Sequence, residues 1–337
     1  MHFLLLFGDI MTSRNVLVIG GSGFVGSSIV ARLSAKGKRV VVPTRRRERA
    51  KHLITLPTVD VVEADVHDPA VLAGLVRGMD AVINLTGVLH SDTGTPYGNR
   101  FRKVHVELAR KVAEAVAAAG VPRLLHMSSL GADASGPSMY LRSKAAGEAA
   151  VREALGTEAG HAALTIFRPS VVFGRNDRFI NLFAKMQAVA PLVALGRASA
   201  KLQPVWVEDL AQAFVNALDE PRTFGKTYAI AGPTVYTLKE LVQYAGKVSG
   251  HVRPVISLPD SLAYLQAFVL ELAPVELLSR DNLDSTKVNS TVPGPGLAET
   301  APELGVHPAA METIVPGYLA GQSPRERYMQ LRDRAGR

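Results

Sequence analysis

A short glycine-rich segment directly after an apolar run constrains this chain more than any other feature. Residues 16–19 read Val-Leu-Val-Ile, and glycines follow at positions 20, 23 and 26. Glycines at this spacing allow a tight turn, a close approach of backbone to a pyrophosphate and close packing of a following helix. A helix beginning near Phe24 would direct its free N–H groups at the phosphates, so we expect a dinucleotide here rather than a generic strand–helix turn. The expected contacts are Gly20, Ser22, Gly23, Phe24, Val25 and Gly26.

Strand-like and helix-like segments alternate through the N-terminal half. The strand candidates are residues 15–19, 39–42, 59–63, 81–85, 124–127 and 164–167, and the helix candidates include 27–36, 69–76 and 104–119. This alternation predicts an α/β fold with a Rossmann-type doubly wound parallel sheet and helices on both faces. Ligands of such folds bind beyond the carboxyl ends of the strands.

The alternation becomes irregular after Pro169, where proline- and glycine-rich stretches separate amphipathic segments. We therefore expect an NAD(P)-binding domain over residues 12–170, to which 204–232 return, and a smaller, mostly helical lobe. This lobe takes residues 171–203 and 233–322, which leaves 1–11 and 323–337 as tails. Residues 1–10 are apolar without Lys or Arg, so an overlong start is expected rather than a secretory signal.

The composition narrows the class of partner. The 337 residues include no cysteine, which excludes disulfides and thiolate metal ligands and indicates a reducing compartment such as the cytoplasm. The net charge of +8 indicates an anionic partner. The basic residues are scattered and only one Trp is present, so we do not expect nucleic acid. His90, His126 and His161 lack metal-ligand spacing, so we expect no metal.

The end of the second predicted strand bears on which dinucleotide binds. An acidic residue there would hold the ribose 2′-OH of NAD(H), whereas this chain has Arg45 and Arg46. Guanidinium groups suit a 2′-phosphate, so we expect NADP(H) to be preferred over NAD(H); a solvated basic loop is the alternative. Further contacts are expected after the third strand, at Asp65 and Val66 near the adenine, and after the fourth, at Leu85, Thr86 and Gly87.

Tyr140 and Lys144 are four residues apart and therefore share one face of a helix. A nearby ammonium favours the phenolate, so this spacing suits a tyrosine that acts as general acid or base beside a nicotinamide.

Four features of the chain occur together in one family: the glycine turn, the Tyr140–Lys144 pair, the segment 168–174 and Trp206-Val207-Glu208-Asp209. By these features the chain resembles an extended short-chain dehydrogenase/reductase. Segments 140–148, 173–179 and 203–205 are similar to its atypical branch, typified by the nucleotide-binding accessory subunit of respiratory complex I, with bacterial epimerase/dehydratase-like relatives. The resemblance implies further cofactor contacts at Ser128, Tyr140, Lys144, Pro169, Val171 and Val172.

The chain departs from the family pattern at two of four catalytic positions. Tyr140 and Lys144 match, but His105 stands where the family has Asn. Leu130 takes the position of the hydroxyl that polarises the substrate carbonyl, with Ser129 one residue early. Leu130 cannot donate a hydrogen bond, so we expect this partner to be absent unless Ser129, our third catalytic candidate, reaches inward.

Three functions are consistent with these residues. The first is an accessory protein whose NADP(H) is structural or redox-sensing, with a link to the respiratory chain or ubiquinone metabolism. The second is an active epimerase/dehydratase or reductase that uses Tyr140 and Lys144 on a lipophilic or nucleotide-sugar substrate. The third is a regulatory module without chemistry.

Two segments leave the partner open. Residues 258–278 are largely apolar, which suits a lipophilic small molecule, a membrane surface, a respiratory-complex protein or packing on the chain's own core. A membrane surface would place a cytoplasmic protein at the inner face of the plasma membrane. Arg175, Asp177 and Arg178 either bind an anionic group at the cleft or pair with one another.

Overall fold

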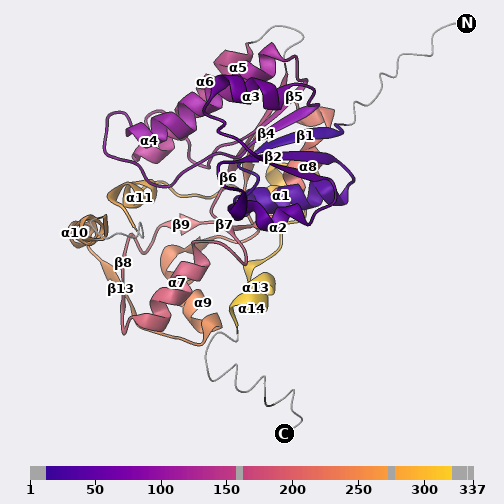
Figure 1. Ribbon diagram of the computed structural model, residues 1–337. Helices are drawn as coiled ribbons and strands as arrows, with labels where there is room; N and C mark the ends of the chain where they lie inside the picture. Colours follow the sequence, from indigo (N-terminus) through magenta and orange to yellow (C-terminus); the bar gives the residue numbers. More distant parts are fainter. Residues whose placement is uncertain (1–12, 157–161, 272–277, 321–331, 333–337) are drawn as a thin grey trace, which may run out of the picture.

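The computed structural model describes residues 13–156, 162–271, 278–320 and 332. Within them, the largest sheet has seven parallel strands in the order β11-β6-β5-β4-β1-β2-β3 (Figure 1). Its strands are β1 (Asn15–Ile19), β2 (Arg39–Thr44), β3 (Val59–Glu63), β4 (Ala81–Asn84), β5 (Arg123–Met127), β6 (Ala163–Pro169) and β11 (Thr227–Ile230). The predicted doubly wound α/β fold is therefore confirmed.

Side chains that alternate along each strand divide the core into two layers. Val16 and Val18 of β1 face one layer, which is covered by α1 (Phe24–Ala35), α2 (Lys51–Ile54) and α8 (Val207–Leu218). Leu17 and Ile19 face the other, which is covered by α3 (Pro69–Val76), α5 (Leu108–Ala118) and α6 (Met139–Leu155) (Figure 1). Because both faces are covered, β1 reads as an unbroken apolar run after its first residue.

Several predicted boundaries differ from the structure, and two of the differences have a physical reason. Strand β2 continues through Pro43 to Thr44, beyond the predicted end at Val42. Proline has no N–H to donate to a neighbouring strand. Because β1 pairs with β2 only as far as Val41, Pro43 interrupts no hydrogen bonds between β2 and β1.

The predicted helix over 104–119 begins earlier and is irregular. It consists of α4 (Asn99–Phe101), a π-helical turn over Arg102–Glu107 and α5. The carbonyl oxygen of His105 lies so close to α6 that a Cβ on Gly147 would be 2.2 Å from it. Gly147 therefore allows the π turn to press its backbone against the helix that carries Tyr140.

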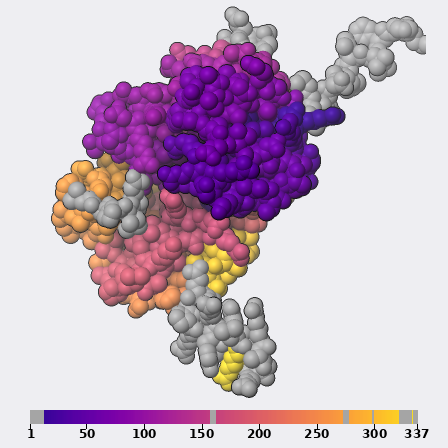
Figure 2. Space-filling model, in the orientation of Figure 1, coloured from indigo at the N-terminus to yellow at the C-terminus, as the bar shows by residue number. Residues whose placement is uncertain are grey.

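The smaller lobe, which lies below the indigo N-terminal part of the molecule in Figure 2, has its own apolar core. Its main helices are α7 (Ile180–Val189), α9 (Leu238–Ser249), α10 (Asp260–Glu271) and α11 (Arg280–Ser285), followed by α13 (Met311–Ile314) and α14 (Pro316–Leu319). Three two-stranded ribbons join them: β7 (Val172–Phe173) with β10 (Val205–Trp206), β9 (Lys201–Leu202) with β12 (Tyr236–Thr237), and β8 (Val193–Gly196) with β13 (Val255–Leu258).

The segment from Leu297 to Val306, which includes α12 (Leu297–Thr300), returns to the main sheet. Leu297, Leu304 and Val306 belong to the same core as α1 and α8. Among the described residues, no helix is long and apolar enough to cross a membrane.

Candidate functional site

The parallel sheet brings the predicted cofactor contacts to one edge. Strands β1 to β6 all run the same way, so the residues that follow them meet beyond their carboxyl ends. The residues placed there are the turn from Gly20 to Gly26, Arg45 and Arg46, Asp65 and Val66, Leu85 to Gly87, Ser128 and Pro169, with Val171 and Val172 directly after it.

The glycine turn is held by close backbone contacts. Gly20 has φ +84°, and its carbonyl accepts a hydrogen bond from the N–H of Gly23 at 3.0 Å. A Cβ on Gly26 would lie 2.3 Å from the same carbonyl oxygen, so the start of α1 is packed directly on the turn. No acidic residue occupies the first turn of α1, which leaves its positive dipole end free for an anion.

Arg45 and Arg46 follow β2 as exposed side chains, and neither forms an ion pair within the described part of the chain. Nearby, the pKa of His67 is lowered, chiefly by burial, although Asp65 raises it. The positive charges of Lys103, Arg45 and Lys111 lower it further, so the end of β2 lies in a positively charged region.

Hydrogen bonds from local polar side chains hold the loops that follow β3 and β4. Asp65 is exposed, and its carboxylate accepts a hydrogen bond from the N–H of His67 at 3.0 Å. Asn84 Oδ1 accepts from the N–H and the hydroxyl of Thr86, at 3.2 and 2.7 Å. Leu85 lies against Gly20, so the turn and the β4 loop form one continuous surface.

Tyr140 lies half-buried at the start of α6, and the Ser129 hydroxyl is near enough to its phenol to lower the pKa of that phenol. Ser129, our third catalytic candidate, therefore lies beside Tyr140, and its catalytic role stays a prediction. The backbone after β5 explains this placement, because the N–H of Leu130 donates to the Pro169 carbonyl at 2.9 Å and fixes the loop.

Lys144 is 3% exposed, and its ammonium donates to the Met127 carbonyl at 2.8 Å. Burial lowers its pKa to about 8, although the Glu148 carboxylate raises it. Burial also raises the pKa of Tyr140 and outweighs the hydrogen bond from Ser129, which lowers it. The effect of burial overrides the expected preference for the phenolate, so Tyr140 is a neutral phenol that can donate a proton.

His105 connects this group to the β4 loop. Its Nε2 accepts from the N–H of Val88 at 3.0 Å, and its Nδ1 lies 2.8 Å from the Ser143 hydroxyl, which donates to the Tyr140 carbonyl. The imidazole stacks on Phe101 and meets the Tyr140 ring edge to face. Burial, with the Lys144 and His126 charges, lowers the pKa of His105 to about 2, so its imidazole stays neutral.

Sequence reasoning missed Asp281, which lies on α11 of the smaller lobe. Its carboxylate accepts from the N–H groups of Met139 and Tyr140, at 2.6 and 3.1 Å. A carboxylate at the N-terminus of α6 stabilises that helix, so the second lobe positions Tyr140. The two residues are 141 positions apart, and no local signal indicates the contact.

The site has features that fit a bound dinucleotide. The hydroxyl of Ser128 is buried at the end of β5 and has no hydrogen-bond partner among the residues that the structure describes. An unpaired buried hydroxyl costs free energy unless a ligand satisfies it. Val171 and Val172 are half-buried beyond β6. The residues at this edge therefore supply polar groups and apolar surface together.

Asp177 does not pair with its neighbouring arginines. It is 5% exposed, and its carboxylate accepts from the N–H groups of Gly174, Phe179 and Asn181. It therefore orders the start of α7. Arg175 and Arg178 remain exposed, with no ion pair within the described ranges.

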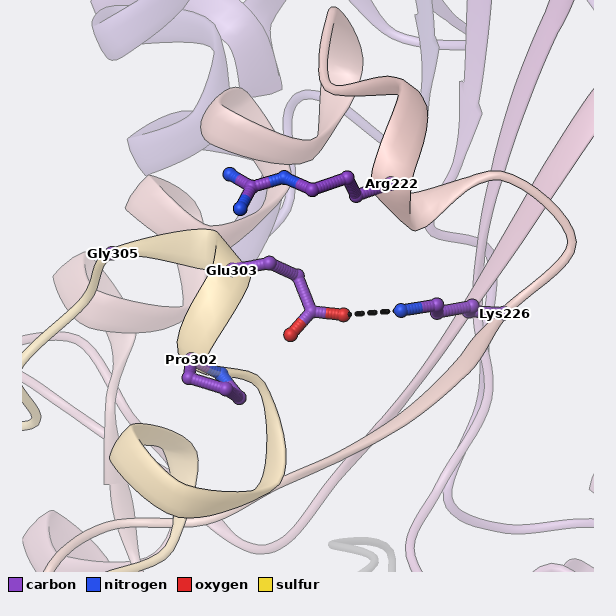
Figure 3. A pocket seen from close by; sticks show the side chains of 5 residues that line it. All are labelled: Arg222, Lys226, Pro302, Glu303 and Gly305. Carbon is purple, nitrogen blue, oxygen red and sulfur yellow. Dashed lines mark hydrogen bonds and ion pairs between the residues drawn. The ribbon is translucent and has the colours of Figure 1, made fainter.

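A surface cavity of about 740 Å³ lies at the opposite end of β11 (Figure 3). Lys226, which precedes that strand, donates to Glu303 at 2.7 Å, and Arg222 pairs with Glu220 at 2.8 Å. Because these carboxylates neutralise the two cations that line the cavity, we assign no ligand to it.

Comparisons with known proteins agree with this arrangement. A family model described as the NAD dependent epimerase/dehydratase family matches residues 16–231. The mitochondrial NADH dehydrogenase (ubiquinone) 1 alpha subcomplex subunit 9 of Mus musculus is 33% identical over 304 residues, which cover 88% of this chain and 77% of that protein. Ceramide reductase of Caulobacter vibrioides is 30% identical over 246 residues, which cover 73% and 74%.

A solved structure shares the fold. DesIV, a dTDP-glucose 4,6-dehydratase from Streptomyces venezuelae with NAD and TYD bound, superposes with a TM-score of 0.71 at 20% identity, covering 90% of this chain and 95% of that one. The expected resemblance to short-chain dehydrogenase/reductases and to the complex I subunit is confirmed. The chain therefore belongs to the NAD-dependent epimerase/dehydratase family.

Proposed function

We propose that this chain holds NADP(H) and serves as an accessory protein of the complex I type, with a structural or redox-sensing nucleotide. The observation that carries the nucleotide choice is the pair Arg45 and Arg46, exposed and without ion pairs among the described residues at the end of β2. Two guanidinium groups at this position would neutralise the 2′-phosphate of NADP(H). To bind the ribose 2′-hydroxyl of NAD(H), a carboxylate would be needed at the same position.

The accessory role rests on relatedness along the chain. The mouse mitochondrial subunit aligns with 88% of it, across both lobes. A nucleotide that binds only the folded state stabilises that state by mass action, so a tightly held dinucleotide can act as a structural part. We infer a link to the respiratory chain, and through it to ubiquinone metabolism, at a membrane surface.

Calorimetry with both dinucleotides tests the nucleotide choice. We expect NADPH to bind more tightly than NADH, and Arg45→Ala with Arg46→Ala to weaken NADPH roughly 10- to 100-fold while sparing NADH. Arg77→Ala, an exposed arginine after α3, is the matched control. Equal affinities in the intact protein would refute the preference.

Purification of the tagged chain from its own cells tests the accessory role. Complex I subunits should co-purify at fixed stoichiometry, with nucleotide detected by mass spectrometry after release. A chain that purifies alone, with nucleotide in rapid exchange, would contradict this role.

The proximity of the Ser129 hydroxyl to Tyr140 favours a second candidate function, carbonyl reduction. A reduced dinucleotide would supply the hydride to a carbonyl carbon. The neutral Tyr140 phenol would donate its proton to the carbonyl oxygen, with the Ser129 hydroxyl beside it and the Lys144 charge nearby. The similarity to a ceramide reductase suggests a long-chain lipid substrate.

Turnover assays separate the two functions. A panel of quinones and long-chain keto lipids should consume NADPH only if the chain is a reductase. Tyr140→Phe should then abolish turnover and leave the NADPH affinity unchanged. Turnover that persists in this variant would remove Tyr140 from the chemistry.

A further inference from the structure

Helix α10 buries its small residues and exposes four of its large apolar ones. Ala263 and Ala267 are 1% and 0% exposed, and a Cβ on Gly196 would lie 2.6 Å from that of Ala263. The outer face of α10, which we define as its four exposed large apolar side chains, consists of Leu262, Leu265, Phe268 and Val269, at 49%, 58%, 43% and 57% exposure.

This distribution is the reverse of a helix that packs on its own core. Of the alternatives for residues 258–278, packing on the chain's own core therefore does not hold for these four side chains, whereas Tyr264 packs beside Ala263 and Ala267. Residues 272–277 lie outside the described residues.

The β8–β13 ribbon leads away from α10 (Figure 1). A second group of exposed apolar side chains lies at its far end. Strand β8 spans only Val193–Gly196, so about 10 Å of backbone separates the two ends of the ribbon. At its far end, residues 188–192 and 250–254 form what we call the lobe tip. Val189 and Val252 there are 87% and 72% exposed. Ile256, on β13 between the tip and α10, is 44% exposed.

Cations accompany the lobe tip without carboxylates. Lys185, Lys247 and Arg253 are exposed, and none of them forms an ion pair within the described part of the lobe. Residues 178–207 and 241–259 contain no Asp or Glu. Exposed apolar side chains flanked by cations suit an anionic lipid surface, whereas protein interfaces are usually depleted in lysine.

We propose that the lobe tip and the outer face of α10 dock this chain onto an anionic lipid bilayer. Val189 and Val252 enter the headgroup region, and α10 lies along it. Lys185, Lys247 and Arg253 lie at the level of the lipid phosphates. The docking face is separate from the strand edge that carries Tyr140, so it does not depend on the nucleotide.

Co-sedimentation with vesicles tests this docking, using phosphatidylcholine alone or with about 30 mol% phosphatidylglycerol. We expect the full chain to bind the anionic vesicles and not the neutral ones. Lys185→Glu with Lys247→Glu should weaken binding by at least about 30-fold, since each cation near an anionic surface contributes roughly fivefold. Wild-type binding that is absent, or equal on both vesicles, overturns the proposal.

Two apolar variants divide the face, and each should reduce binding about tenfold or more. Val189→Asp with Val252→Asp tests the tip, and Leu265→Asp with Phe268→Asp tests α10. Ile54→Asp, a residue on α2 with 44% exposure, is the matched control and should bind as wild type does. Unchanged binding in the tip variant overturns the docking, and unchanged binding in the α10 variant removes that helix from it.

NADPH affinity measured on the same variants separates this proposal from the proposed function. The docking variants should retain wild-type NADPH affinity, whereas loss of it would indicate misfolding rather than loss of a membrane contact. Fluorescence quenching of single labels at Val189 and Leu265 by brominated lipids then decides whether these positions touch the bilayer in the folded wild-type background.

Discussion

Nδ1 of His105 lies 2.8 Å from the hydroxyl of Ser143, and the same imidazole accepts the Val88 N–H through Nε2. One nitrogen is therefore an acceptor and the other a donor, which is the neutral tautomer. This histidine holds the β4 loop against the helix of Tyr140 without carrying charge, and it can do so only while it stays unprotonated.

Stability should therefore fall in mild acid. The folded chain protonates His105 and His126 only near pH 2 and 3, because burial lowers both pKa values. The unfolded chain takes up these protons near pH 6.5, so stability is lost as pH falls below that value. Between about pH 7.5 and about pH 5.5 we expect each histidine to cost about 1.4 kcal/mol of stability. Urea titrations should show that His105→Asn removes about half of this loss of stability. If the free energy of unfolding depends on pH as steeply in this variant as in the wild type, His105 is not neutral in the folded chain.

The glycine turn should not accept a side chain at position 26. A Cβ there would lie 2.3 Å from the Gly20 carbonyl oxygen, so Gly26→Ala should destabilise the fold by about 1–3 kcal/mol and weaken nucleotide binding. Gly74→Ala is the control, because nothing lies within 4 Å of its Cβ in α3, and it should stabilise by roughly 0.5–1 kcal/mol. Thermal unfolding and calorimetry would report both, and equal effects would argue against the close packing of α1.

Removal of the Asp281 carboxylate should loosen the helix of Tyr140. Asp281→Ala leaves the N–H groups of Met139 and Tyr140 without their acceptor and should cost about 1–2 kcal/mol. Glu153→Ala, an exposed position on the same helix, should change stability by less than about 0.5 kcal/mol. Hydrogen exchange at the start of α6 should quicken only in the Asp281 variant.

The ionisation of Tyr140 offers a spectroscopic test of its contact with Ser129. The phenol should ionise above the usual tyrosine pKa, because burial outweighs the hydrogen bond. Ser129→Ala should raise that pKa further by removing the interaction that lowers it. The difference in ultraviolet titration between the wild type and Tyr140→Phe isolates this phenol. A lower pKa in Ser129→Ala would refute the contact.

The sequence predicts the sheet and the strand edge well, because both depend on local patterns. Apolar runs such as 15–19 are strands by composition, and parallel topology then gathers the residues that follow them at one edge. The reach of Ser129 depends on a backbone contact between Leu130 and Pro169, which residue spacing does not encode.

Contacts between residues that are far apart in the sequence could not be predicted from local patterns. Asp281 meets α6 only because the second lobe folds back on the first. The exposed face of α10 could not be distinguished from a core face, since Leu262 and Ala263 are both apolar and only packing decides which is buried.

The last strand of the sheet has a consequence for synthesis on the ribosome. Strand β11 pairs with β6, which leaves the ribosome roughly 60 residues earlier, and Leu297 and Val306 close the same core later still. The nucleotide lobe therefore has an open β6 edge until β11 is translated, and its apolar core is incompletely covered while residues 231–296 are translated. We expect the core of the nucleotide lobe to close only after the segment from Leu297 to Val306 has been translated.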